Sequence, residues 1–247
     1  MTLAKSDVKY FQKGEKENPK FWSRFGKEPS FDGLSVLDVG CGHGSLCVDI
    51  ASKGAKKVVG IDTNGHFIDF ARENAVKNFP KLKNILEFKN CEIGVLPECK
   101  FDIILSKDSF EHILNVDVVL WEMKKRLKLF GKIYLGFGPL YSSPFGDHKR
   151  LRAILPWGHL IFPESFLLKK LNKKNREKIA NVYDLGLNKL SLDEFEKLFY
   201  KSGLRVLYFG VNVSNNPLSM IFSLTRKISF LKEYFSHNIY CVLEKVK

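Results

Sequence analysis

The segment VLDVGCGHG, residues 36–44, sets the architecture that we expect for this chain. An apolar run leads into glycines at positions 40, 42 and 44, a pattern typical of a strand that turns sharply into a helix. Because glycine has no Cβ, the backbone of such a turn can approach a ligand closely. A glycine-rich turn without a ligand would look the same, so the interpretation depends on the surrounding sequence.

Strands and helices alternate around this segment. Short apolar and β-branched runs predict strands at 35–39, 57–62, 85–89, 101–106 and 132–138. Helical spacing of apolar residues predicts helices at 45–53, 64–78 and 116–129. This alternation predicts an α/β fold with a Rossmann-like, doubly wound and mostly parallel sheet covered on both faces.

The alternation stops after the fifth strand. Residues 139–190 contain several prolines and no clean strand, and we expect a helical insertion there, over the end of the sheet. Ser191 and Glu194 predict a capping box at the start of a helix that ends at Gly203. Two last strands, at 204–213 and 238–246, lack a helical crossover between them. They predict an antiparallel C-terminal hairpin that completes a seven-stranded sheet.

The composition fits one globular domain. The 247 residues are 45% hydrophobic, which excludes a disordered chain. No uncharged apolar run approaches the roughly 18 residues of a transmembrane segment, and residues 1–12 lack the apolar core of a signal peptide. The five cysteines form no C-x-x-C pair. We therefore expect reduced thiols in a cytoplasmic protein, with no disulfide and no zinc site.

Positive charge is concentrated in the last third of the chain. The net charge is +13, from 40 Lys and Arg against 27 Asp and Glu. Residues 141–247 hold 18 basic and 9 acidic side chains, whereas residues 32–140 hold 15 and 14. The charge therefore indicates an anionic substrate or surface rather than a particular reaction.

Three residues indicate which nucleoside the glycine-rich turn would bind. Asp62 ends the second strand, where a carboxylate can accept hydrogen bonds from both hydroxyls of a ribose. Ser45 stands where a dinucleotide fingerprint needs its last glycine, and the turn has no lysine for a phosphate-binding loop. Asp38, just before the turn, disfavours a pyrophosphate and suits an ammonium group. A nucleoside that carries an amino acid fits best, and that is S-adenosylmethionine.

The chain resembles the class I S-adenosylmethionine-dependent methyltransferases, of the group often called type 11. Four segments carry the resemblance, VLDVGCGHG (36–44), VVGIDTN (58–64), FDIILSKDSFEHI (101–113) and RLKLFGKIYLGFGP (126–139). It implies a methyltransferase that uses S-adenosyl-L-methionine and releases S-adenosyl-L-homocysteine. The four segments cover about residues 34–140. We expect residues 1–31 to cover the cofactor and residues 32–247 to form the methyltransferase domain.

The resemblance assigns residues of this chain to the cofactor. Its methionine part would be held by Asp38, Gly40, Cys41, Gly42 and Gly44. Asp62 would hold the ribose, and Thr63 would lie near the adenine. Glu92 with Ile93 would also contact the adenine, or Cys91 would take that place. The residues expected to border both the cofactor and the acceptor are Ser106 and Lys107.

Catalysis asks for a well-placed acceptor and, for a hydroxyl or ammonium acceptor, a base. In-line displacement needs the acceptor at about 3 Å from the methyl carbon. Candidate catalytic residues are His148 and His159, in aromatic and Pro/Gly-rich segments after the fifth strand, and His112, after the fourth. Asp108 and Asp147 are alternative bases. The histidines could instead brace the insertion, and an aspartate with two of them could hold a divalent ion, although we expect no metal.

The acceptor region is expected to be the insertion at 139–190, with residues 214–237 as a second lid. Residues 151–174 and 218–235 combine apolar side chains with lysines. Such segments can contact an anionic membrane surface, although packing of their apolar faces on the domain is the more common outcome.

The function predicted from these residues is methyl transfer to an oxygen or nitrogen of a small-molecule, sugar or lipid-linked acceptor. An RNA methyltransferase is an alternative that the basic last third favours. Against it, SKDS at 106–109 differs from the [DNS]-P-P-[YF] used for methylation of base amines. A non-catalytic S-adenosylmethionine-binding protein is the other alternative.

Overall fold

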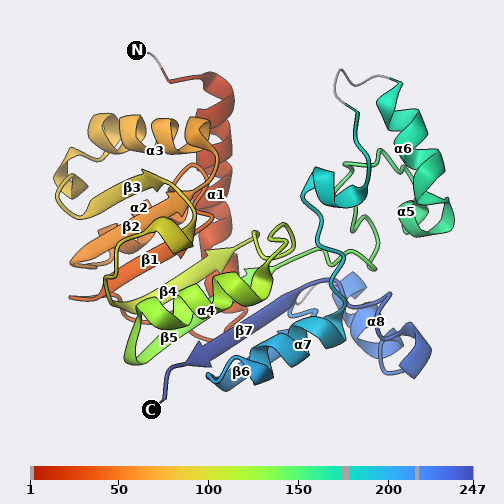
Figure 1. The fold of residues 1–247 in the computed structure, drawn as a ribbon. Helices are drawn as coiled ribbons and strands as arrows, with labels where there is room; N and C mark the ends of the chain where they lie inside the picture. The colour runs from red at the N-terminus through yellow and green to blue at the C-terminus, as the bar shows by residue number, and fades with distance from the viewer. Residues whose placement is uncertain (1–2, 174–177, 215–216, 247) are drawn as a thin grey trace.

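Seven strands form one sheet in the order β3–β2–β1–β4–β5–β7–β6 (Figure 1). The computed structural model describes residues 3–173, 178–214 and 217–246. The strands are β1 (Ser35–Val39), β2 (Lys57–Asp62), β3 (Leu86–Asn90), β4 (Phe101–Lys107), β5 (Leu127–Phe137), β6 (Arg205–Val211) and β7 (Ile239–Glu244). β1 to β5 are parallel, and β7 runs antiparallel to β5 and β6. The predicted sheet with its antiparallel C-terminal pair is confirmed.

Helices cover both faces of the sheet. The α-helices are α1 (Lys5–Ser23), α2 (Ser45–Ser52), α3 (Gly65–Asn78), α4 (Val116–Arg126), α5 (Gly158–Ile161), α6 (Glu164–Asn172), α7 (Leu192–Lys201) and α8 (Pro217–Thr225). Short 3-10 turns are η1 (Pro80–Leu82), η2 (Ile93–Val95), η3 (Val182–Leu185) and η4 (Ser229–Leu231). Apolar side chains of α1, α2 and α3 pack in one core with Val36 of β1, and those of α4 and α7 pack in another with Leu37. Neighbouring residues of a strand point to opposite faces, so both cores need the apolar run of β1.

The order of the strands reverses at β1. β2 pairs with one side of β1 and β4 with the other, so the connections that leave the ends of β1 and β4 run in opposite directions. In parallel sheets a crevice opens at the carboxyl ends of the strands at such a point, and ligands bind there. The glycine-rich segment follows β1 directly, which places it at this crevice.

The boundary between α4 and β5 differs from the sequence prediction. We expected a helix to residue 129 and a strand from residue 132, but α4 ends at Arg126 and β5 begins at Leu127. Leu127 and Leu129 extend the apolar spacing of the helix, which is why sequence alone places them in it. Leu127 instead pairs with Phe101 in the sheet, and Phe130 takes a positive φ of 62° and donates its N–H to the carbonyl oxygen of Lys245. Pairing with neighbouring strands decides the boundary.

The insertion after β5 contains α5, α6 and η3, and lies beyond the end of the sheet (Figure 1). It is followed by α7, whose predicted capping box is confirmed, with the Ser191 side chain accepting from the N–H of Glu194 and the Glu194 side chain accepting from that of Ser191. None of the described helices is long and apolar enough to cross a membrane.

α1 packs beside the start of α2. Its Trp22 lies in the core, with ring centroids 5.3 Å from Phe31 and 5.7 Å from Tyr134. Asn18 is buried and its Nδ2 donates to the carbonyl oxygen of Ser45, 3.3 Å away. The N-terminal segment is therefore anchored in the core by Trp22 and contacts the end of the glycine-rich turn through Asn18.

Asp102, near the start of β4, joins three elements of the sheet. Its Oδ2 accepts from the N–H and the Oγ of Ser35, at 2.8 and 2.7 Å, and its Oδ1 accepts from Nζ of Lys128 at 2.8 Å. Burial alone would raise the pKa of Asp102, but the hydrogen bonds from Lys128 and Ser35 lower it to about 2.

We expect Asp102→Asn to lower the free energy of unfolding at pH 7 by about 1.5–3 kcal/mol, the usual contribution of hydrogen bonds to a charged group. The folded pKa lies below the unfolded value of about 3.9, so this contribution is complete above the unfolded pKa and is lost as the pH falls through the folded pKa. Urea unfolding at pH 7 and at pH 3 checks it, with Asp69→Asn on an exposed side chain as the control. An equal loss at both pH values would contradict the assignment to the ionised carboxylate.

Candidate active site

The loop between β1 and α2 needs glycine at its three glycine positions. Gly40, Gly42 and Gly44 have φ of 79°, 53° and 80°, which disfavours other residues. A Cβ on Gly40 would lie 2.2 Å from Oγ of Ser109, and one on Gly44 would lie 2.7 Å from the ring of Phe88. A Cβ on Gly42 would meet no atom within 4 Å. The outer glycines thus allow close packing, while the space beside Gly42 is open to a ligand.

Asp62 holds this loop against the end of β2. Its Oδ2 accepts from the N–H of Gly42 at 2.9 Å, and its Oδ1 accepts from the N–H of Asn64 at 2.8 Å. The N–H groups of Gly40 and Cys41 donate to the carbonyl oxygen of Ile61, at 2.8 and 3.0 Å. Each carboxylate oxygen can accept a further hydrogen bond, so the contact with the loop leaves Asp62 able to accept from a pair of hydroxyls.

Asp38 lies beneath the loop as a buried carboxyl group. It is 2% exposed, its Oδ2 accepts from Sγ of Cys47 at 3.3 Å, and its Oδ1 has no hydrogen-bond partner. Burial raises the pKa of Asp38 to about 7, against smaller lowering by the Cys47 hydrogen bond and the charge of Lys107. A buried acceptor without a partner is costly, which is consistent with a group that awaits a ligand cation.

The other predicted cofactor residues differ in how deeply they are buried. Thr63 and Glu92 are exposed, Cys91 is half-buried, and Ile93 packs in the core beside β1 and β2. Ser106 is buried and donates to the carbonyl oxygen of Val39 at 2.7 Å.

Lys107 faces α1 from the end of β4. Its Nζ donates to Oδ1 of Asn18 at 3.2 Å and lies 5.9 Å from the ring centroid of Phe21. α1 therefore contacts both sides of the crevice, at Ser45 after β1 and at Lys107 of β4.

A cavity of about 350 Å³ lies beside the carboxyl ends of β4 and β5. Asp108, Phe137 and Gly138 follow or end these strands and form one side of it. Ser109, which follows Asp108 in the sequence, places its Oγ 3.4 Å from the carbonyl oxygen of Gly40. One wall of the cavity is therefore continuous with the glycine-rich loop, and its volume suits a small ligand or the head of a larger one.

Polar groups in this cavity come from segments far apart in the sequence. Arg24 donates to the hydroxyl of Tyr240, with its guanidinium 5.0 Å from the ring centroid. The Oγ of Ser143 donates to the carbonyl oxygen of Leu140 at 2.8 Å, and Nδ1 of His237 lies 3.3 Å from that Oγ. Ser143 thus acts as the acceptor for Nδ1–H of His237, which leaves Nε2 of His237 as a proton acceptor.

His237 and Asp108, which both line the cavity, have shifted pKa values. Burial, with the neighbouring charges of His148 and Arg24, lowers the pKa of His237, so its imidazole is neutral at pH 7. Burial raises the pKa of Asp108, and Lys107 opposes this. Asp108 also has a positive φ of 51°, a conformation that costs an L-residue about 1–2 kcal/mol.

Sequence reasoning named Asp108 but missed Arg24, His237 and Tyr240. His237 is the last residue of the predicted second lid, 214–237, and lies two residues before β7, and this position was the available signal. Arg24 and Tyr240 lie at opposite ends of the chain, so no local pattern could have joined them.

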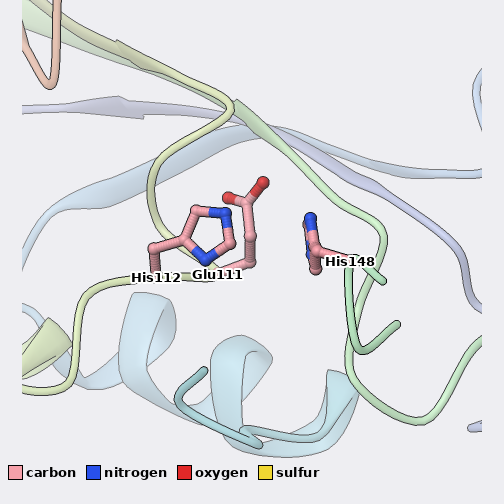
Figure 2. A group of neighbouring side chains, drawn as sticks. All are labelled: Glu111, His112 and His148. Atoms are coloured by element: carbon pink, nitrogen blue, oxygen red, sulfur yellow. The ribbon is translucent and has the colours of Figure 1, made fainter. Parts of the chain in front are cut away.

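Glu111, His112 and His148 form a polar cluster next to the cavity (Figure 2). The rings of His112 and His148 are 4.5 Å apart, and Glu111 Oε1 accepts from the N–H of Gly138 at 3.4 Å. Burial raises the pKa of Glu111 to about 8, while burial and the charge of Arg150 lower the pKa of His112 to about 4. At neutral pH the carboxyl group is mostly protonated and the imidazole is neutral.

This cluster is also the group of metal-ligating side chains that the described residues bring within 4.8 Å of one another. Nδ1–H of His112 donates to the carbonyl oxygen of Gly186 at 2.9 Å, and Nε2–H of His148 donates to that of Pro139 at 3.0 Å. Arg150 places its Nη2 3.4 Å from Nε2 of His112. The guanidinium of Arg150 is thus a cation beside the cluster, and its positive charge opposes the binding of a divalent ion there.

His159 is buried inside the insertion. Its Nε2–H donates to the carbonyl oxygen of Tyr141 at 2.5 Å, and its Nδ1 lies 3.9 Å from Oδ1 of Asp147. Both side chains are 0% exposed, and Asp147 accepts from the N–H of Leu151 at 3.2 Å. These contacts hold the insertion together. Of the three histidines predicted to be catalytic, the structure brings His112 and His148 together beside the cavity, and none of the three lines it.

Comparison with known proteins gives consistent matches. A family model described as a methyltransferase domain matches residues 30–137. A ubiquinone biosynthesis O-methyltransferase of Bartonella tribocorum is 30% identical over 204 residues, which cover 81% of this chain and 73% of that protein. One from Brucella anthropi is 26% identical over 215 residues, covering 84% and 75%.

Solved structures share the fold. Geranyl diphosphate C-methyltransferase of Streptomyces coelicolor, in complex with Mg²⁺, geranyl diphosphate and S-adenosyl-L-homocysteine, superposes with a TM-score of 0.62. It is 15% identical in sequence, and the match covers 98% of this chain and 83% of that one.

We expect Asp62→Ala to weaken S-adenosyl-L-homocysteine binding at least about 100-fold, because hydrogen bonds to a charged group contribute about 1.5–3 kcal/mol each. Titration calorimetry measures this, with Asp69→Ala on the exposed face of α3 as the matched control. Wild-type affinity in Asp62→Ala would exclude the ribose contact. Circular dichroism of both variants checks that the loop change leaves the fold intact.

Proposed function

This chain belongs to the class I S-adenosylmethionine-dependent methyltransferases, and on this premise we propose that it methylates an oxygen or nitrogen of a small-molecule acceptor held in the cavity beside β4 and β5. The acceptor can be a free metabolite, a sugar or the head of a lipid-linked molecule. The observation that carries the proposal is the shared wall, in which Asp108 faces the cavity and Ser109 contacts Gly40 of the glycine-rich loop. The five cysteines are all free thiols, which supports a cytoplasmic location.

The proposed cofactor contacts follow the loop outward. Gly42 and the orphan Oδ1 of Asp38 would face the methionine part, with the carboxyl group of Asp38 opposite the ammonium. Asp62 would accept from the ribose hydroxyls, and the predicted adenine residues would lie beyond the ribose. The sulfonium would then lie toward Ser106 and Lys107, at the end of β4.

Methyl transfer from a sulfonium needs mainly position and the exclusion of water. Once an acceptor fills the cavity, its walls and α1 can supply both. Phe137, Phe145 and Phe222 give the cavity an apolar body, and Arg24, Asp108 and His237 give it a polar side. An acceptor with an apolar body and a hydroxyl or amino group matches this lining.

His237 is the proposed base for a hydroxyl acceptor. Its Nε2 is left free to accept a proton by the hydrogen bond at Nδ1, and its lowered pKa keeps it neutral. His112, His148 and His159 stay predictions for this role. Each donates one ring N–H to a backbone carbonyl oxygen, and none of the three lines the cavity. The relatives named as ubiquinone biosynthesis O-methyltransferases support a small-molecule acceptor and an oxygen as the methylated atom.

We expect His237→Gln to lower kcat by about 100-fold or more, which is the usual contribution of a general base, while cofactor affinity stays unchanged. Single-turnover assays with labelled cofactor on an active acceptor fraction measure it. His66→Gln, on an exposed ring in α3, is the control. A wild-type rate in His237→Gln together with a large loss in His148→Gln would move the base to the neighbouring cluster.

Incubation of a cell extract with cofactor carrying a tritiated methyl group tests the acceptor class. We expect the label in the small-metabolite or lipid fraction, and His237→Gln should reduce that labelling. Label in RNA that ribonuclease releases would overturn the proposed acceptor and favour the RNA methyltransferase alternative.

A further inference from the structure

One end of the molecule exposes apolar side chains from two segments. The first segment, residues 154–166, includes α5 and the start of α6, and the second, residues 218–234, includes most of α8 and η4. Figure 1 shows α5 and α6 at the upper right of the molecule and α8 at the lower right, all on the side away from β3. Side chains more than half exposed include Ile154, Ile161, Phe166, Met220, Leu224 and Phe230. Large apolar side chains gathered in this way mark an interaction surface.

The two segments form one surface because Trp157 joins them. Its ring centroid lies 5.2 Å from that of Phe235 and 6.4 Å from that of Phe222. Its Nε1 donates to the carbonyl oxygen of Tyr234 at 3.2 Å. The exposed side chains of α5 and α8 therefore flank a packed aromatic centre.

The charge around this surface is positive. Residues 139–173 and 217–235, as far as the structure describes them, contain no exposed acidic side chain. Glu164 pairs with Lys189 at 2.6 Å, and Glu233 accepts from the N–H of Leu192 at 3.0 Å. The exposed basic side chains of these residues are Lys149, Arg152, Lys169, Lys170, Lys173 and Lys227.

The same segments build the acceptor cavity. Leu218 and Phe222 of α8 line it, together with Phe145 of the insertion. Phe145 also lines a second, more open hollow, shared with Lys149, Arg152 and Ile154. The cavity is thus bordered by the apolar and basic surface, so a molecule bound against that surface lies next to the proposed site of methylation.

We propose that this end of the protein docks on an anionic phospholipid bilayer and receives its methyl acceptor from it, as an amphiphile whose polar head enters the cavity. The second part rests on the proposed function, because it takes the cavity as the acceptor site. Aliphatic and aromatic side chains gain free energy by leaving water for the acyl region, while the lysines stay at the headgroups. RNA would use the lysines but leave Ile161 and Phe230 in water.

Vesicle sedimentation of the full chain, without cofactor or acceptor, tests the docking. One vesicle set contains phosphatidylglycerol in phosphatidylcholine, and the other is phosphatidylcholine alone. We expect binding to the first set that weakens as salt is added, and little binding to the second.

Two double variants separate the apolar and electrostatic contributions. Ile161→Ser with Phe230→Ser should weaken binding at least about ten-fold, given the usual gain from burying such side chains. Lys169→Gln with Lys170→Gln should weaken it about five-fold for each lysine. The matched controls are Val118→Ser with Leu129→Ser and Lys56→Gln with Lys81→Gln, which change exposed residues outside this surface. S-adenosyl-L-homocysteine affinity shows that each variant is folded.

The outcomes separate docking from catalysis. No binding to anionic vesicles, or unchanged binding by both double variants, overturns the docking even if methyl transfer proceeds. RNA binding that falls in the lysine variant, with vesicle binding unaffected by Ile161→Ser and Phe230→Ser, identifies a nucleic-acid surface instead. Vesicle binding without any transfer to lipid or small-metabolite fractions leaves the docking in place and rejects the proposed function.

Discussion

The hydrogen bond from the N–H of Gly42 to the carboxylate of Asp62 is the contact on which the rest of the site depends. It holds a loop whose three glycines have positive φ against the end of β2. Ser109, which follows Asp108 of the cavity wall, donates its Oγ–H to the carbonyl oxygen of Gly40 in this loop. The loop ends at the start of α2, where Asn18 of α1 donates to the carbonyl oxygen of Ser45. Since Asp62 is also the proposed ribose contact, cofactor binding and loop geometry are coupled through one carboxylate.

Burial shifts the pKa values of the titratable groups of the site so that their neutral forms are favoured. Asp38 and Glu111 have raised pKa values, near 7 and 8, because each is enclosed with one carboxylate oxygen lacking a partner. Burial and nearby positive charge lower the pKa values of His112 and His237. An environment that disfavours charge of either sign suits a reaction in which a cationic sulfonium becomes a neutral thioether, because the product is less charged than the cofactor.

The surplus positive charge now has a location. It lies on the insertion and on the residues that follow α8, around an apolar surface that borders the cavity, rather than along the cofactor half. This arrangement explains how a nearly neutral catalytic sheet can work with a basic recognition surface. In the proposed function the sheet provides a rigid cofactor site, and the segments that leave its carboxyl end would select the acceptor.

By itself the sequence determined the sheet, the glycine-rich loop and the place of Asp62, because these depend on patterns within a few residues of one another. It misplaced the end of α4, where strand pairing overrides the apolar spacing of Leu127 and Leu129. Only the tertiary structure decided which polar residues share the cavity. Arg24 and Tyr240, or Ser143 and His237, are separated by 216 and 94 positions, and no local periodicity encodes such contacts. They form because strand order brings those segments to one end of the sheet.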